Sequence, residues 1–104
     1  MPKTWSGKSK FDYTGSVKTG TDISYGKSYK ARVSAQQYTA LRKYFINNIV
    51  PVGTSRTDAP RESLGWWLQA NVTRTAIASY VAPILVLESY AKPEGKHNIR
   101  ITKY

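Results

Sequence analysis

The stretch from Asp58 to Ala91 constrains the fold more than any other part of this 104-residue chain. It contains a short apolar segment at 64–68, a polar break at 69–71 and a longer apolar segment at 77–85. In both segments the apolar residues recur at helical spacing, and Asp58 is a candidate N-cap for the first one. The stretch therefore predicts two short helices joined by a polar turn.

The second of these helices is predicted to begin at Thr73 or Thr75, both candidate N-caps, and to run to about residue 87. Pro83 is the difficulty, because a proline inside a helix removes a backbone hydrogen bond at a cost of about 3 kcal/mol. One alternative is a helix that ends at Pro83, followed by a buried strand at 84–87. We expect a continuous helix, because the apolar residues keep helical spacing through the proline.

An earlier helix is predicted over 34–48. Ser34 is its N-cap, and Gln37 can complete a capping box by reaching back to the Ser34 amide. Apolar side chains recur on one face at helical spacing, and Asn47-Asn48 ends the helix. Residues 49–53 then form either a very short strand or an apolar linker.

The C-terminal residues predict a β-hairpin. Pro93-Glu94-Gly95 has turn chemistry, and the isoleucines at 99 and 101 alternate with polar residues as in a half-buried strand. Tyr90-Ala91 is the expected partner strand. The tip of this hairpin would carry Lys92, Lys96 and His97.

Residues 1–33 are basic, with seven Lys and Arg against two Asp, and they are rich in Gly, Ser and Thr. Two weak strands are predicted at 10–17 and 28–33, so the segment is expected to be an arm or a β-hairpin. Its five large aromatic rings argue against plain disorder. Basic residues next to rings could follow a phosphate backbone and stack on bases, although covering the core is the simpler role for the rings.

Charge and composition limit the function classes. The formal net charge of +10 favours a polyanionic partner, and nucleic acid is the commonest one. The chain has no Cys, one His, and six Asp and Glu without a spacing typical of metal binding or acid–base catalysis, so we expect no enzyme, no metal and no cofactor. No apolar run approaches the roughly 18 residues of a transmembrane helix, and residues 1–15 lack a signal-peptide core, so an intracellular protein without a membrane partner is expected.

Several short motifs follow one another in the order of a known superfamily. They are Leu64-Gly65 and Leu68 in the first helix of the pair, Thr73-Arg74-Thr75-Ala76-Ile77 opening the second, Leu85 closing it, Ser89-Tyr90-Ala91 entering the hairpin and Gly95-Lys96-His97 at its tip. Through them, residues 34–104 resemble the winged helix-turn-helix superfamily of DNA-binding domains. The resemblance implies an α+β fold, a small winged helix of three helices plus a C-terminal β-hairpin wing, preceded by the basic N-terminal arm or hairpin of residues 1–33.

The resemblance also implies a function in binding double-stranded DNA, either as a small transcription regulator or as an architectural, chromatin-like factor. The residues implied to face the major groove are Thr73, Arg74, Thr75 and Ser79. Those implied to contact phosphates or the minor groove from the wing are Lys92, Lys96, His97 and Arg100, with Arg56 adding a backbone contact from a loop. A homodimer would suit a two-fold DNA site. The alternatives are an RNA-binding or ribonucleoprotein-associated module that uses the N-terminal arm, and a protein-interaction winged helix.

Overall fold

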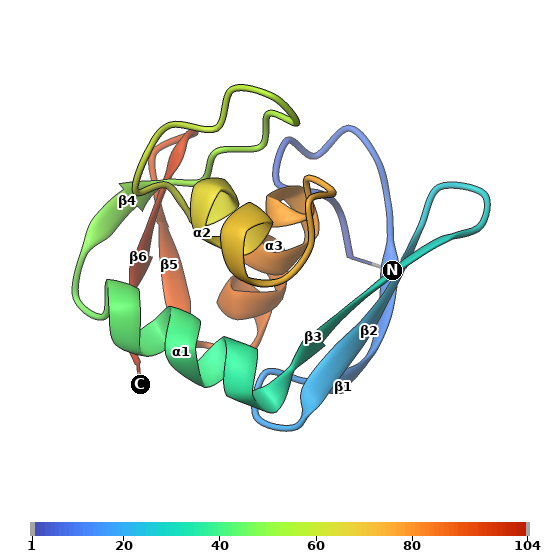
Figure 1. The fold of residues 1–104 in the computed structure, drawn as a ribbon, viewed down its shortest axis with the longest axis horizontal. Helices are drawn as coiled ribbons and strands as arrows, with labels where there is room; N and C mark the ends of the chain where they lie inside the picture. Colours follow the sequence, from blue (N-terminus) through green and yellow to red (C-terminus); the bar gives the residue numbers. More distant parts are fainter. Residues whose placement is uncertain (1, 104) are drawn as a thin grey trace.

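The computed structural model describes residues 2–103, which form three helices and two antiparallel sheets of three strands each. Figure 1 shows the two sheets on opposite sides of α2 (Leu64–Asn71) and α3 (Ala78–Leu87). The first helix, α1 (Ala35–Phe45), runs along one end and contacts strands of both sheets. The helices therefore separate the sheets, and α3 is the most buried of the three.

The N-terminal sheet is a meander of β1 (Asp12–Ser16), β2 (Gly20–Tyr25) and β3 (Tyr29–Ser34) in that spatial order. The strands predicted at 10–17 and 28–33 are confirmed, and β2 between them was missed. The inner face carries Ile23 and Val33, which are fully buried and belong to the same hydrophobic core as the helices. Residues 12–33 therefore belong to a sheet that packs into the core, and not to a separate arm.

The start of α1 is as predicted. The Ser34 side chain accepts a hydrogen bond from the Gln37 amide at 3.1 Å, and the Gln37 side chain accepts one from the Ser34 amide at 2.8 Å. This capping box satisfies two backbone donors at the helix end. The helix ends at Phe45, shortly before the predicted end at Asn47-Asn48, and Asn47 takes a left-handed conformation with φ 63°.

The second sheet consists of β4 (Ile49–Pro51), β5 (Ala91–Glu94) and β6 (Asn98–Ile101), with β6 in the centre. The predicted C-terminal hairpin is confirmed, but its turn is shorter than expected because Pro93 and Glu94 are the last residues of β5. Of the two alternatives for residues 49–53, the short strand is confirmed, because β4 lies there. Pro51 is tolerated there because β4 lies at an edge of the sheet.

The predicted winged-helix fold is wrong. Residues 2–103 form two three-stranded antiparallel sheets flanking three helices, not a three-helix domain with a two-stranded C-terminal wing and an N-terminal arm. Two features caused the difference. The N-terminal third makes a full sheet that packs into the core, and β4 turns the C-terminal hairpin into a second sheet.

The predicted N-cap of α2 is also wrong. The helix begins after Ser63, whose fully buried side chain accepts from the Trp66 amide at 3.1 Å, and not after Asp58. The preceding Glu62 has φ 67°, outside the helical region. Gly65 is needed at the start of α2 because a Cβ there would lie 1.8 Å from the carbonyl oxygen of Gly53. The absence of a side chain at Gly65 therefore allows the loop at Gly53 to pack against the start of α2.

The third helix begins later than predicted but continues through its proline. It starts at Ala78 without a side-chain cap, so Thr73 and Thr75 lie in the preceding loop. Pro83 lies inside α3, which runs on to Leu87, so the expected continuous helix is confirmed. No helix within residues 2–103 combines the length and the apolar character that crossing a membrane requires.

Candidate nucleic-acid interface

A groove of about 580 Å³ lies between the β2–β3 turn, the N-terminal segment and the loop before α3. We call it the tyrosine groove because three tyrosine rings form its apolar part. It is lined by Ser9, Lys10, Tyr25, Gly26, Tyr29, Arg56, Arg74, Thr75, Ala76 and Tyr80. It brings together four segments that are far apart in the sequence.

The three tyrosines form a stack. The rings of Tyr25 and Tyr80 have centroids 4.4 Å apart and planes at 23°, and those of Tyr25 and Tyr29 are 5.7 Å apart at 16°. Tyr25 and Tyr29 are register partners at the end of the β2–β3 hairpin, which places both rings on one side of it. Tyr29 ends the stack and is 65% exposed. An exposed ring at the end of a stack is a surface on which a further flat ring can pack.

Three exposed cations surround this stack, namely Lys10, Arg56 and Arg74. No ion pair found in residues 2–103 involves any of them; the two that are present join Arg32 to Asp22 and Arg100 to Glu94. One side chain ties two of the lining loops together, since the Gln69 amide donates to the Arg56 carbonyl at 2.9 Å and to the Arg74 carbonyl at 3.4 Å. The backbones of Arg56 and Arg74 are thus held near one another, and within residues 2–103 none of the three cations forms an ion pair.

The pKa of Tyr80 is affected by its neighbours in the groove. Burial raises the pKa of its hydroxyl, the nearby Tyr25 raises it further, and the positive charge of Arg56 acts in the opposite direction. The Tyr80 hydroxyl is therefore neutral at physiological pH and available as a hydrogen-bond donor and acceptor in the groove.

The residues implied for the major groove fall in different places. Arg74 and Thr75 line the tyrosine groove, together with the loop residue Arg56. The hydroxyl of Thr73 accepts from the Thr75 amide at 3.4 Å, outside the lining. Ser79 lies in α3 beneath the N-terminal segment, where its carbonyl accepts from the Trp5 amide at 2.9 Å.

The residues implied for the wing lie away from the tyrosine groove. Lys92 and Arg100 are register partners on β5 and β6, and Arg100 forms an ion pair with Glu94 at 3.3 Å. Lys96 and His97 are exposed in the turn between these strands, where they line a separate hollow. Of the nine implied residues, three therefore line the tyrosine groove and two, Lys96 and His97, line the hollow at the β5–β6 turn. The other four line neither of these hollows.

Sequence reasoning missed Lys10, Tyr25, Tyr29 and Tyr80 as candidate site residues. The rings of Tyr25 and Tyr29 were expected to cover the core, which holds in part because Tyr25 is half-buried, and Tyr80 was not singled out. The signal that could have identified the site is the pair Tyr25 and Tyr29 flanking Gly26-Lys27-Ser28. A turn of that length makes the two rings neighbours on one face of a hairpin.

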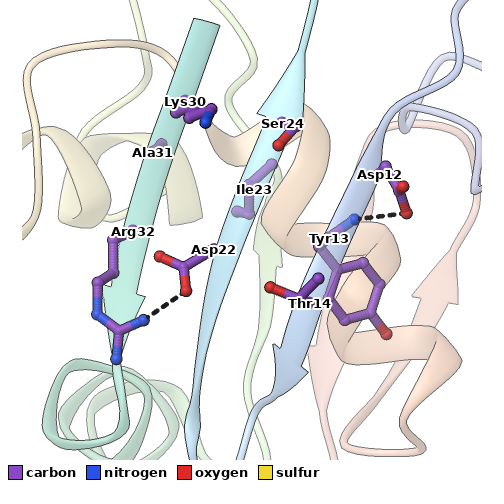
Figure 2. A pocket seen from close by; sticks show the side chains of 9 residues that line it. All are labelled: Asp12, Tyr13, Thr14, Asp22, Ile23, Ser24, Lys30, Ala31 and Arg32. Atoms are coloured by element: carbon purple, nitrogen blue, oxygen red, sulfur yellow. Dashed lines mark hydrogen bonds and ion pairs between the residues drawn. The ribbon is translucent and has the colours of Figure 1, made fainter.

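A second hollow, of about 460 Å³, lies on the N-terminal sheet and has a different charge character (Figure 2). Asp12 and Asp22 oppose Lys30 and Arg32 there, and Arg32 donates to Asp22 at 2.9 Å. Both partners of this ion pair are largely solvent-exposed, so it adds little stability. Because its charges balance, this face does not favour a polyanion.

No group of three His, Asp or Glu side chains in residues 2–103 could hold a metal ion. No protein-family model, curated protein or solved structure matches the chain. No relative therefore assigns a ligand to the tyrosine groove.

Proposed function

We propose that the protein binds nucleic acid in the tyrosine groove, with an unpaired base stacked on Tyr29 and phosphates held by Lys10, Arg56 and Arg74. The observation that carries this proposal is the exposed end of a tyrosine stack next to three cations that form no ion pair within residues 2–103. Proteins that bind single strands combine these two elements, a positive groove for the backbone and aromatic rings for the bases.

The net charge of +10 supports the same partner class. A polyanion gains from the long-range attraction of the whole molecule, and contact with phosphates releases the counterions that surround a nucleic acid. Binding by this route depends on salt. Three phosphate contacts to a single strand correspond to a slope of about −2 in log affinity against log salt.

Duplex DNA is the second candidate, favoured by the exposed Lys92 and Lys96 near the β5–β6 turn. A helix that enters the major groove needs an exposed face. Leu87 is the one residue of α3 that is exposed, and the N-terminal segment covers the start of the helix at Ser79. A groove with a stacking surface also suits unpaired bases better than paired ones. The single strand is therefore the preferred ligand.

The experiment is a binding titration of a single strand and of its duplex at two salt concentrations. We expect tighter binding of the single strand and a slope of about −2. Arg74→Glu should weaken binding by about tenfold or more and make the slope shallower by about one contact. The matched control is Lys43→Glu, an equal charge reversal at an exposed position on α1 outside the groove. An affinity that does not change with salt concentration, or an equal loss of affinity in Arg74→Glu and Lys43→Glu, would contradict the proposal.

A further inference from the structure

We infer that the path of the bound strand continues from the tyrosine groove across residues 54–55 to the β5–β6 turn, where Lys96 and His97 make a second contact. This inference rests on the proposed function and extends it from one base to several nucleotides. It predicts that the tyrosine groove and the β5–β6 turn each contribute separately to the affinity for a long strand.

Two further hollows lie beyond the groove, with volumes of about 240 Å³ and about 680 Å³. They share Trp5, Thr54 and His97, so they adjoin each other. The smaller one reaches Ser55, which is the chain neighbour of Arg56 in the tyrosine groove. One loop therefore connects the groove to the β5–β6 turn.

The N-terminal segment makes the same connection independently. Trp5 and Ser6 line the larger hollow, and Ser9 and Lys10 line the tyrosine groove. The groove and the two hollows thus follow one another along two chain segments, an arrangement that suits an extended strand. Sites that follow a single-stranded backbone commonly span about four nucleotides or more.

The charged side chains along this path are all positive. Among the described residues that line the three hollows there is no Asp or Glu, whereas Lys10, Arg56, Arg74 and Lys96 all lie on it. The hollow of Figure 2, by contrast, contains two carboxylates. The lining of the path is therefore free of carboxylates and carries four cations, as contact with successive phosphates requires.

Trp5 provides a second aromatic surface on the path. Its amide donates to the Ser79 carbonyl at 2.9 Å and its indole Nε1 donates to the Lys96 carbonyl at 2.8 Å. The half-buried ring is thus fixed in orientation before any ligand binds, which lowers the entropic cost of stacking a base on it. Rings at both ends of a positive track favour a strand that alternates bases with phosphates over an acidic peptide.

The test compares single strands of about three and about twelve nucleotides, a length range that brackets the proposed path. For the unmodified protein, the long strand should bind at least about tenfold more tightly, because its second contact is made at high effective concentration. Lys96→Glu should leave binding of the short strand within about twofold of the unmodified protein and remove most of the gain from length. Lys43→Glu is again the control and should change neither.

The outcomes separate the two proposals. If the short strand binds and Arg74→Glu abolishes that binding, the proposed function stands, whatever Lys96→Glu does to the long strand. A long strand that gains no affinity, or a Lys96→Glu variant that keeps the full gain, would overturn the extended path. If neither strand binds, the proposed function itself is overturned. A polyglutamate of similar length that competes as well as the long strand would overturn the choice of nucleic acid as the partner.

Discussion

The backbone amide of Trp5 donates a hydrogen bond to the carbonyl of Ser79 at 2.9 Å. Ser79 lies four residues before Pro83, so its carbonyl lacks the helical donor that any residue other than proline would supply. The N-terminal segment thus satisfies the acceptor that the proline leaves open. This contact explains how α3 tolerates an interior proline and why the N-terminal residues belong to the fold.

Substitution of Trp5 tests this account. Trp5→Ala should lower the free energy of unfolding by about 2–4 kcal/mol, because it removes a half-buried indole and its bond to Lys96. Both variants keep the backbone amide of residue 5, and Trp5→Phe also keeps most of the packed area, so its loss should be smaller. Urea unfolding of both variants measures the difference. A Trp5→Ala variant as stable as the unmodified protein would show that the Trp5 side chain does not anchor the N-terminal segment over α3.

Ser89 offers a stabilising change. It follows the end of α3 with φ 66°, the left-handed conformation that glycine adopts without steric cost. The Tyr90 amide donates to the Leu85 carbonyl at 2.8 Å and the Ser89 amide to that of Val86 at 3.1 Å, which is the Schellman pattern. Ser89→Gly should therefore raise the melting temperature, with a gain of about 0.5–1 kcal/mol. Ser89→Ala, which keeps the unfavourable conformation, should show no such gain.

Gly65 is predicted to be intolerant of any side chain. Its amide donates to the Val52 carbonyl at 2.8 Å, and a Cβ would overlap the carbonyl of Gly53. Because the Cβ would clash with backbone atoms, which cannot rotate away as a side chain can, the clash can be removed only if the loop at Gly53 and α2 move apart. Gly65→Ala should cost about 2 kcal/mol or more despite the better helix propensity of alanine. Ala70→Ser, at an exposed position in the same helix, is the control and should change stability by less than about 1 kcal/mol.

Alkaline pH should weaken the fold through Tyr13. Burial, then the hydrogen bond to Glu88, raises the pKa of Tyr13 from 10.0 to about 12. Since the folded state holds the proton more tightly than the unfolded state, this stabilisation is complete below pH 10 and is lost as the pH rises towards about 12. Tyr13→Phe should be less stable than the unmodified protein at neutral pH, by about 1 kcal/mol for the lost hydrogen bond. The difference between the two should narrow above pH 10. A difference that stays constant across that range would contradict the assignment.

Local signals predicted the parts of the fold that depend on neighbouring residues. The capping box of Ser34 and Gln37 and the C-terminal hairpin both follow from short-range chemistry. The strand β2 escaped prediction because its Gly, Ser and Thr resemble a loop. The buried Thr21 forms a hydrogen bond between its hydroxyl and that of Tyr38 at 2.7 Å. No local sequence pattern predicts this contact.

Long-range contacts decided the rest. Asp58 has the chemistry of an N-cap, but α2 begins at Leu64 after the buried Ser63, where the loop at Val52 and Gly53 fixes the helix start. The same holds for the site. Arg56 was expected as a loop contact and Arg74 as part of a recognition helix, whereas the tyrosine groove depends on Tyr80 meeting a hairpin some 50 residues earlier in the chain.

The most direct test of the central claim is the affinity of Tyr29→Ala for a single strand, measured by fluorescence anisotropy beside the unmodified protein. Stacking of a base on an aromatic side chain contributes about 1–3 kcal/mol, so affinity should fall by about 5- to 150-fold. Tyr44→Ala removes another exposed tyrosine, on α1 outside the groove, and should leave affinity unchanged. If Tyr29→Ala binds the strand as tightly as the unmodified protein does, the tyrosine groove is not where nucleic acid binds.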